Sequence, residues 1–434
     1  MNNHFNHQNT HLSGFNRRDF IKATGAIGAL LLSNNGFAKA TKPPLGRVVV
    51  IGGGYAGATA AKYLRLWSLG AIEVVVVEPN TQFVSCPLSN LVLGGSKSIN
   101  DLTFGYDALK TNHGIKWVHD KVTTIDAEAK KITLSRGELS YDRLIVAPGI
   151  DFDFASLPML ASAEAQNQIP HAWKAGWQTV NLRKQLEAMP DGGVFVMNVP
   201  KAPYRCPPGP YERVCQVASY LKTNKPKSKI VVLDANAEII SKKGLFSKAW
   251  AELYPGIIDY RPDHAISNVE VASKTVSTEF DQFKADVLNV IPPQRAGKIA
   301  QIADLTEKDY PWCEVNFLTY ESKRVQNVHV IGDSVAAGLP KSAHMATNQA
   351  KICANAIVQL LAGQVPDPAP VFANTCYSYV SDKSAMHVAN VYRYDEAKKI
   401  MVSAEGGGVS LSPSEKEGEY AVAWSQNIWA DTLT

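Results

Sequence analysis

A glycine-rich loop that follows a short apolar segment is the feature that most constrains the fold of this chain. Residues 48–51 form a β-branched run typical of a buried strand, and they lead directly into Gly52-x-Gly54-x-x-Gly57. In a dinucleotide-binding unit, Gly52 would make the tight turn, Gly54 would let the backbone approach a pyrophosphate, and Gly57 would let a helix pack closely on the strand. The spacing therefore predicts the phosphate-binding loop of a Rossmann-type domain.

The segments after the loop complete this unit. An Ala-rich helical segment at 58–66 would direct the N–H groups of its first turn at the phosphates, and a second apolar strand at 74–77 ends in Glu78. The Glu78 carboxylate can accept hydrogen bonds from ribose hydroxyls. Far along the chain, a strand at 328–331 delivers Asp333, whose carboxylate can bind a ribityl hydroxyl. The two signatures together favour FAD over NAD in this domain.

The first forty residues have the pattern of an export signal. A segment at 16–22 resembles a twin-arginine motif, an uncharged stretch follows at 23–32, and residues 38–40 read Ala-Lys-Ala, a small-x-small cleavage site. The uncharged stretch is too short for a membrane anchor. Because the twin-arginine route exports folded proteins, it suits a protein that receives its cofactor before export. We expect residues 1–40 to be a signal peptide and the mature chain, from about Thr41, to reside in the periplasm.

Composition and cysteine spacing exclude several classes of function. The chain has 434 residues, of which 45% are hydrophobic and 19% charged, as in a globular protein of two or three domains. Its formal net charge of +4 lies mostly in the signal, which argues against nucleic acid as a partner. No later run is long and apolar enough to cross a membrane. The six cysteines form no C-x-x-C or C-x-x-C-H pattern, so the sequence predicts no metal site, and any haem lies on another chain.

One cysteine lies a few residues beyond Glu78. In flavoproteins with two dinucleotide-binding domains this region approaches the isoalloxazine ring, so Cys86 can form a covalent thioether to the flavin or act as a redox thiol. A half-buried structural cysteine fits the spacing equally well. The residues alone leave these interpretations open.

A second Rossmann-shaped half lacks a phosphate cradle. Strands are expected at 193–198 and 231–234, but the loop 199–210 between them carries prolines where an NAD-binding loop needs glycines. Prolines have no N–H to donate, and side chains block a close approach of the backbone. We therefore expect this domain not to bind a nicotinamide, and to present Cys206 from the loop instead.

Cys206 precedes a predicted helix at 211–221. A helix N-terminus and the neighbouring Arg205 would favour its thiolate, and Glu212, in the first turns of the helix, can accept a proton near the sulfur. An inert loop thiol and a plain first-turn acid are the alternative interpretations. Cys215, inside the helix, is expected to pack in the core.

The pattern predicts an α/β chain with two Rossmann-like domains, one for FAD and one NAD-like, and a C-terminal α+β interface domain. In that last domain we expect strands and turns, with glycines 406–408 at a loop tip, while Trp424 and Trp429 line the flavin pocket, an interface or the core. The expected ranges are 41–150 and 285–365 for the FAD-binding domain, 151–284 for the NAD-like domain that carries the redox cysteine, and 366–434 for the domain that caps the flavin.

Several further motifs carry a family resemblance. From Arg47 to the C-terminus the chain resembles the flavoprotein subunit of flavocytochrome c sulfide dehydrogenase. The motifs that carry it are Arg-Cys-Pro-Pro-Gly-Pro-Tyr-Glu-Arg at 205–213, His-Ala-Trp-Lys-Ala-Gly at 171–176, Ile-Pro-Pro-Gln-Arg-Ala-Gly-Lys at 291–298 and Asn-Thr-Cys-Tyr-Ser at 374–378.

The resemblance implies roles for individual residues. It implies that FAD is attached through an 8α-S-cysteinyl bond at Cys86, although Pro87 departs from the aromatic residue that the family can carry beside it. It also implies a redox-active disulfide between Cys206 and Cys376, with Glu212 as the acid of the active site. Hydrosulfide would attack the disulfide, and electrons would pass through FAD to the haem of a c-type cytochrome subunit.

Other functions fit the same scaffold. A sulfide:quinone oxidoreductase uses the same flavin and sulfur chemistry. Such enzymes usually carry an amphipathic C-terminal anchor, whereas the C-terminal segment here, residues 425–434, is short. An accessory flavoprotein of thiosulfate oxidation is a further alternative, and an NADH dehydrogenase is disfavoured by the glycine-free second loop. A sulfane-sulfur carrier that keeps FAD only as structure is the non-enzymatic alternative.

Overall fold

A parallel five-stranded sheet forms the first domain of the computed structural model, which describes residues 45–434. The signal peptide predicted for residues 1–40 lies outside the described residues. The strand order is β19-β9-β1-β2-β5, and all four pairings are parallel. The strands are β1 (Gly46–Ile51), β2 (Ile72–Val77), β5 (Lys116–Val118), β9 (Arg143–Val146) and β19 (Val328–Val330). This is the expected first Rossmann unit.

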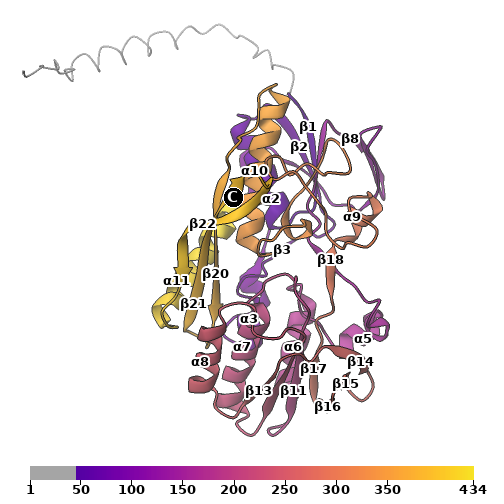
Figure 1. The fold of residues 1–434 in the computed structure, drawn as a ribbon. Helices are drawn as coiled ribbons and strands as arrows, with labels where there is room; N and C mark the ends of the chain where they lie inside the picture. Colours follow the sequence, from indigo (N-terminus) through magenta and orange to yellow (C-terminus); the bar gives the residue numbers. More distant parts are fainter. Residues whose placement is uncertain (1–44) are drawn as a thin grey trace, which may run out of the picture. The chain divides into compact units, whose positions relative to one another are not determined.

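One helix packs on this sheet, and a second helix packs on the first. Helix α2 (Tyr55–Trp67) buries a face of small residues, which lets α10 (Ala343–Leu361) approach closely. The Ser342 side chain caps α10 by accepting a hydrogen bond from the N–H of Met345 (3.1 Å), as is typical of a serine at a helix start. Figure 1 shows β1 and β2 of this sheet beside α2 and α10. No helix among residues 45–434 combines the length and the hydropathy needed to span a bilayer.

Shorter elements surround the first sheet. A two-stranded ribbon, β3-β4, lies between β2 and β5 in the chain, and a three-stranded antiparallel meander, β6-β7-β8, follows β5. They are β3 (Phe83–Val84), α3 (Ser89–Gly94), η2 (Ile99–Leu102), β4 (Thr103–Phe104), α4 (Asp107–His113), β6 (Val122–Asp126), β7 (Lys131–Leu134) and β8 (Gly137–Ser140).

A second parallel sheet, of order β13-β12-β11-β17, forms the NAD-like domain. Its strands are β11 (Val194–Val199), β12 (Lys229–Asp234), β13 (Ile258–Arg261) and β17 (Val287–Asn289), and its helices are α6 (Trp177–Ala188), α7 (Gly209–Asn224) and α8 (Lys243–Leu253). The expected return to the first domain at residue 285 is wrong by a few residues, because β17 hydrogen-bonds to β11. The second sheet therefore keeps the chain through Asn289.

A narrow antiparallel pair carries the chain between the two domains. Strand β10 (Ile150–Phe152) leaves the first sheet, and β18 (Gln294–Ala296) returns beside it. The remaining elements of these domains are η3 (Pro158–Leu160), α5 (Ala163–Gln168), β14 (Ile266–Glu270), β15 (Thr275–Thr278), β16 (Gln282–Lys284), α9 (Lys298–Ile302) and η4 (Gly332–Ser334).

The C-terminal domain is a three-stranded antiparallel sheet covered by one long helix. Strands β20 (Val371–Tyr379), β21 (Ala385–Asp395) and β22 (Ile400–Val409) pair in order, and α11 (Glu415–Leu433) packs on β20, β21 and α2. The expected loop tip at 406–408 is wrong, because these glycines lie inside β22 at a bulge. A Cβ atom on Gly407, where φ is +91°, would lie 2.2 Å from the carbonyl oxygen of Ala389, so the bulge requires glycine.

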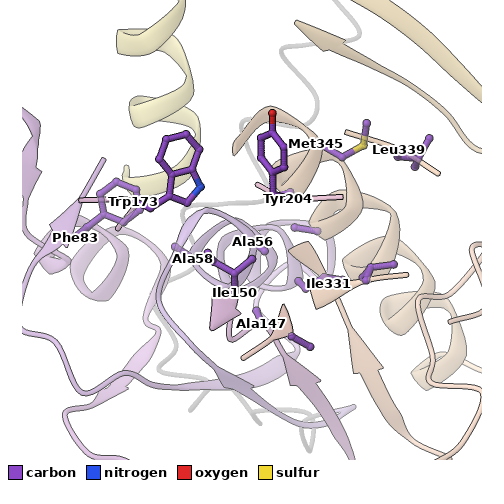
Figure 2. Packing of buried hydrophobic residues seen from close by; sticks show 14 of the residues in the cluster. Ala56, Ala58, Phe83, Ala147, Ile150, Trp173, Tyr204, Ile331, Leu339 and Met345 are labelled. Atoms are coloured by element: carbon purple, nitrogen blue, oxygen red, sulfur yellow. The ribbon is translucent and has the colours of Figure 1, made fainter. Parts of the chain in front are cut away.

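The largest apolar cluster joins segments that are far apart in the sequence. Figure 2 labels Ala56 and Ile150 together with Ile331, a cluster member that belongs to the returning segment of the first domain. The same cluster contains Trp173 and Tyr204 from the NAD-like domain and Phe372 from the C-terminal sheet. One continuous core therefore holds the region where the three domains meet.

Candidate functional site

The glycine loop has the geometry of a phosphate cradle. Gly52 has φ +100°, and a Cβ atom there would lie 2.4 Å from the Ala147 carbonyl oxygen. A Cβ atom on Gly57 would lie 1.9 Å from the Gly52 carbonyl oxygen, so α2 can start this close to β1 only with glycine. A Cβ atom on Gly54 would meet no protein atom within 4 Å, and Gly54 lines a large cavity. Two of the glycines thus serve the packing, and the third leaves room for a ligand.

The cavity has a volume of about 960 Å³, which suits a large cofactor. It begins at the glycine loop and reaches the start of α10. The predicted site residues along its wall are Gly52, Gly54, Glu78, Cys86 and Asp333. It also includes Arg205 of the proline-rich loop, so the second domain closes one side of it. The residues present therefore fit FAD, with the pyrophosphate at the glycine loop.

Glu78 is held at the end of β2 by the loop that it faces. Its carboxylate accepts hydrogen bonds from the Gly53 N–H (2.7 Å) and from the Asn80 N–H (2.8 Å) and side-chain amide (2.6 Å). A carboxylate has about four acceptor positions, so one remains for a ribose hydroxyl. Binding of a ribose hydroxyl by Glu78 stays a prediction.

Asp333 is half-buried and also lines the cavity. Burial raises the pKa of its carboxyl, and the charges of Arg205 and Lys341 lower it. The Lys341 ammonium donates to the carbonyl oxygens of Asp333 (2.8 Å) and Val335 (2.7 Å) and stands 3.7 Å from the centre of the Trp312 ring. Burial lowers the pKa of Lys341 to about 8. Nothing in the sequence pattern marked Lys341.

Cys86 shares its part of the cavity wall with Arg205. Burial acts to lower the pKa of the Arg205 guanidinium, but the charges of Cys86 and Asp333 outweigh it and raise that pKa. Arg205 is thus the cation that faces both the cysteine and the acid of the cofactor cavity.

Cys206 follows Arg205 and sits at the start of α7. Its backbone has φ +59°, its N–H donates to the Lys341 carbonyl oxygen (2.7 Å), and the thiol is half-buried. A Cβ atom on Gly209 would lie 2.8 Å from the Cys206 Sγ, so that glycine makes room for the sulfur. These contacts aim the sulfur at the region where the domains meet.

The expected thiolate at Cys206 is wrong for the dithiol form that the structure describes. Burial raises the pKa of the Cys206 thiol, and the charges of Glu212 and Cys376 raise it further. The Arg205 charge acts in the opposite direction but is the weaker effect. Desolvation of an anion in this enclosed position therefore exceeds the help of the neighbouring cation.

Glu212 connects three parts of the molecule. It is buried in the first turn of α7, where its carboxylate accepts hydrogen bonds from the Asn90 side chain (2.8 Å) and from the Tyr379 N–H of β20 (2.8 Å). Burial raises the pKa of Glu212, against the lowering effect of those two hydrogen bonds and of Lys242 and Arg213. A buried carboxyl with a raised pKa is suited to holding or releasing a proton near neutral pH.

Cys376 lies on β20, three residues before Tyr379. The Asn374 side-chain amide contacts its Sγ (3.6 Å), while the Lys242 ammonium donates to its carbonyl oxygen (3.2 Å) and to the Ser378 hydroxyl (2.9 Å). The Cys206 and Cys376 sulfurs are close enough for a charge on Cys376 to raise the pKa of Cys206. All six cysteines of residues 45–434 are free thiols, so the disulfide stays a prediction.

The other three cysteines are core residues. Cys215, Cys313 and Cys353 have no exposed surface, and the Trp250 indole donates to the Cys215 Sγ (3.1 Å). Burial is the main cause that raises the pKa of each thiol. The prediction that Cys215 packs in the core is confirmed.

Trp429 of α11 supports the flavin cavity from behind. Its indole N–H lies 3.0 Å from the Tyr55 hydroxyl and 2.9 Å from the Ser85 hydroxyl, and Tyr55 is part of the cavity wall. The C-terminal helix thus fixes the side chains that stand next to Cys86.

In the second Rossmann half, the acid at the position that would bind a ribose is already fully hydrogen-bonded within the protein. The Asp234 carboxylate, at the end of β12, is fully buried and accepts hydrogen bonds from the Tyr211 and Tyr260 hydroxyls (2.9 Å each) and from the backbone and side-chain nitrogens of Asn236 (2.8 Å each). Four donors occupy the acceptor positions of one carboxylate. This geometry agrees with the prediction that the NAD-like domain does not hold a nicotinamide cofactor.

Comparisons with known proteins cover most of the described chain. The family "Pyridine nucleotide-disulphide oxidoreductase" matches residues 46–172. The family "Sulfide dehydrogenase (flavocytochrome c) flavoprotein chain, central" matches residues 179–292, and "Flavocytochrome c sulphide dehydrogenase, flavin-binding" matches residues 368–433. The three matches follow one another along the chain, and the first extends from the FAD-binding domain into the start of the NAD-like domain.

Curated relatives and a solved structure agree with these matches. The sulfide dehydrogenase (flavocytochrome c) flavoprotein chain of Chlorobaculum thiosulfatiphilum is 59% identical over 46 residues, which are 11% of this chain and 94% of that sequence. The mitochondrial sulfide:quinone oxidoreductase of Mus musculus is 25% identical over 74% of this chain and 72% of its own length. The crystal structure of the sulfide:quinone oxidoreductase of Aquifex aeolicus superposes with a TM-score of 0.71, at 18% identity, over 89% of this chain and 91% of that one.

Proposed function

This chain belongs to the family of flavocytochrome c sulfide dehydrogenase flavoprotein chains, and we propose that it oxidises hydrosulfide in the periplasm and passes electrons singly to a c-type cytochrome subunit. Membership makes it an FAD-dependent sulfide oxidoreductase. The acceptor, the compartment, the redox disulfide and the covalent flavin are the parts that we propose.

One observation carries the chemistry. The Glu212 carboxylate accepts a hydrogen bond from Tyr379, which holds the start of α7, with Cys206, against the strand that carries Cys376 (2.8 Å). The residue before Cys206, Arg205, lines the cofactor cavity. Two thiols and a buried acid thus stand next to a cavity of the size that FAD needs.

The chain's own residues account for the sulfur steps. Hydrosulfide attacks the disulfide between Cys206 and Cys376: a new sulfur–sulfur bond forms to one cysteine, the old one breaks, and the other cysteine leaves as a thiolate. A second hydrosulfide takes the sulfane sulfur from the persulfide as a hydrodisulfide ion, which leaves both cysteines reduced. When the disulfide forms again, two electrons and a proton are released, and Glu212 is placed to accept the proton. FAD held in the cavity lined by Gly54, Glu78 and Asp333 would supply an acceptor for that electron pair that can release electrons singly.

The decisive experiment follows the flavin and the acceptor together. Purified protein is mixed anaerobically with sulfide while the flavin absorbance near 450 nm is recorded, and oxidised c-type cytochrome is then added. We expect sulfide to bleach the flavin and the cytochrome to restore it. A flavin that stays oxidised in sulfide would leave only the carrier function, in which FAD is structural.

Covalent attachment of FAD at Cys86 has its own test. Cys86 lies on the cavity wall together with the cationic Arg205, which is the setting expected for a thiol that bonds to the ring. After acid precipitation, the mass of the intact polypeptide should exceed that of the apoprotein by one FAD, and Cys86→Ala should lose the added mass. Flavin that washes out of the wild-type chain would overturn the attachment and leave FAD bound noncovalently.

Quinone is the second candidate acceptor, because two of the relatives above are named sulfide:quinone oxidoreductase. The two acceptors are separated by supplying a soluble ubiquinone analogue and a c-type cytochrome at equal electron capacity. Faster reoxidation of the flavin by the quinone would replace the cytochrome in this proposal. The compartment is tested on the protein from its native host by sequencing the N-terminus, which should begin near Thr41.

A further inference from the structure

A lysine of the NAD-like domain reaches the sulfur site from outside the motifs that define it. Lys242 stands at the N-terminal end of α8 with φ +54°, and its half-buried side chain extends to β20. The ammonium donates to the Cys376 carbonyl oxygen (3.2 Å) and to the Ser378 hydroxyl (2.9 Å). Both acceptors belong to β20, the strand whose Tyr379 N–H donates to Glu212. Lys242 and Glu212 therefore both bind β20, Lys242 at Cys376 and Ser378 and Glu212 at Tyr379.

The Lys242 ammonium has a donor to spare. An ammonium carries three N–H donors, and within residues 45–434 only the two acceptors on β20 receive them. It forms no salt bridge with any carboxylate in that part of the chain. Burial lowers the pKa of Lys242, and the charges of Cys376, Glu212 and Cys206 act in the opposite direction. A cation with an unused donor beside two reactive thiols is suited to a small anion.

The two neighbouring arginines are committed elsewhere. The Arg213 guanidinium donates to the carbonyl oxygens of His171 (2.9 Å) and Ala172 (2.6 Å), and also to the side-chain oxygens of Asn289 (2.8 Å) and Asn90 (3.2 Å). Arg205 faces the cofactor cavity. Of these three cations, Lys242 is the one that has a free donor and binds the strand of Cys376.

We propose that Lys242 is the anion-binding group of the sulfur site, which holds the hydrosulfide ion, and afterwards the terminal sulfur of the persulfide, beside Cys376. This inference rests on the proposed oxidation of hydrosulfide. It gives the site a preference for anionic sulfur species over neutral hydrogen sulfide, because an unpaired ammonium in a partly buried position attracts an anion far more strongly than a neutral molecule. It also explains why a lysine is kept in an enclosed position without a carboxylate partner.

The first test measures charge preference without turnover. The reduced holoprotein is treated with iodoacetate, an anion, and separately with iodoacetamide, its neutral analogue, and labelling of Cys376 is followed by peptide mass spectrometry. Both reagents need the same thiolate, so a change in thiol pKa cancels in the ratio of the two rates. We expect Lys242→Met to lower the iodoacetate-to-iodoacetamide ratio at least fivefold, and Lys242→Arg to keep it within twofold of the wild type.

Two matched controls separate charge from structure. Lys243→Met removes the adjacent lysine, which pairs with Glu238 at the surface (2.5 Å), and should leave the ratio unchanged. Ser378→Ala removes one anchor of the Lys242 side chain while the charge remains, so the ratio should stay above that of Lys242→Met. An equal ratio in Lys242→Met and wild type overturns the proposal.

The second test uses sulfide itself. In Lys242→Met, the hydrosulfide concentration for half-maximal bleaching of the flavin should rise at least tenfold, with the maximal rate within threefold of wild type, and Lys242→Arg should restore it. An unchanged concentration overturns the role of Lys242 even where sulfide still bleaches the flavin. A lowered alkylation ratio in a protein whose flavin sulfide never bleaches would instead keep the anion site and reject the oxidation of sulfide.

Discussion

The Glu212 carboxylate and the Tyr379 N–H are joined by a hydrogen bond of 2.8 Å that connects the first turn of α7 to β20, 167 residues later in the chain. The same carboxylate accepts from Asn90 of α3, so one buried acid contacts all three domains. The protonation state of Glu212 should therefore affect the free energy of unfolding.

The contribution of Glu212 to the free energy of unfolding should decrease as pH rises. Burial raises the pKa of this carboxyl in the folded protein, so the folded state binds its proton more tightly than the unfolded state does. The contribution is then most favourable below the ordinary pKa of glutamic acid and is lost as pH rises through the folded value, at about 1.4 kcal/mol for each tenfold difference in proton affinity between the two states. Glu212→Gln cannot titrate, so it should gain stability relative to wild type between pH 4.5 and 8.

Urea unfolding of both proteins at several pH values checks this prediction. The other titrating groups are common to the two proteins and cancel in the difference. A difference in the free energy of unfolding that does not change with pH would contradict the raised pKa.

Cys376→Ser should stop the reduction of the flavin by sulfide while FAD remains bound. The sulfur–sulfur bond that hydrosulfide attacks needs both cysteines, whereas the cofactor cavity is lined by other residues. The rate of bleaching at 450 nm and the flavin content of the purified protein are measured together. Ala373→Ser, at an exposed position of the same strand, is the matched control and should bleach at the wild-type rate.

Two glycines of the loop should respond to alanine in different ways. A Cβ atom on Gly57 would overlap the Gly52 carbonyl oxygen at 1.9 Å, so Gly57→Ala should destabilise the apoprotein by about 1–3 kcal/mol. A Cβ atom on Gly54 meets no protein atom within 4 Å, so Gly54→Ala should fold normally but hold FAD at least tenfold more weakly. Thermal unfolding of apoproteins that also carry Cys86→Ala, followed by FAD titration, separates the effects. An equal loss of stability in both would contradict the assignment.

Asp234→Asn should cost about 2–4 kcal/mol of stability without creating or removing any activity. The Asp234 carboxylate accepts from four donors, and an amide in its place turns two of its own N–H groups toward them. Asp259→Asn, which breaks a largely exposed ion pair with Arg261, should cost less than about 1 kcal/mol. Denaturant unfolding measures both, and neither variant should allow NADH to reduce the flavin.

The sequence predicted the parts of this fold that depend on local pattern. The strand at 48–51, the glycine spacing and the acid at Glu78 are short-range features, and each lies where the Rossmann pattern requires it. The end of the NAD-like domain is harder to predict from the sequence, because an apolar strand such as β17 could belong to either sheet. Only its pairing with β11 assigns β17 to the second sheet.

Other features depend on contacts that no local pattern contains. Lys242 stands in a Ser-Lys-Lys-Gly segment that is typical of a solvated surface, and its partner Cys376 is 134 residues away. Helix α11 contains Gly418, which weakens a helical pattern; a Cβ atom there would lie 1.9 Å from the Lys383 carbonyl oxygen, so the glycine permits close packing of the helix on the turn after β20. The sequence shows the cation beside Cys206, which would lower the pKa of its thiol, but it does not show the burial, which raises that pKa.

The order of the chain also sets when this protein can become active. Glu212 and Lys242 belong to the NAD-like domain, yet both finish their hydrogen bonding on β20, which starts at Val371. A nascent chain that has emerged only as far as α10 already holds the glycine loop and most of the cofactor cavity, but leaves a buried acid and an ammonium without the strand that they share. The proposed sulfur site is therefore complete only after β20, which carries Cys376, has been synthesised and has paired with Glu212.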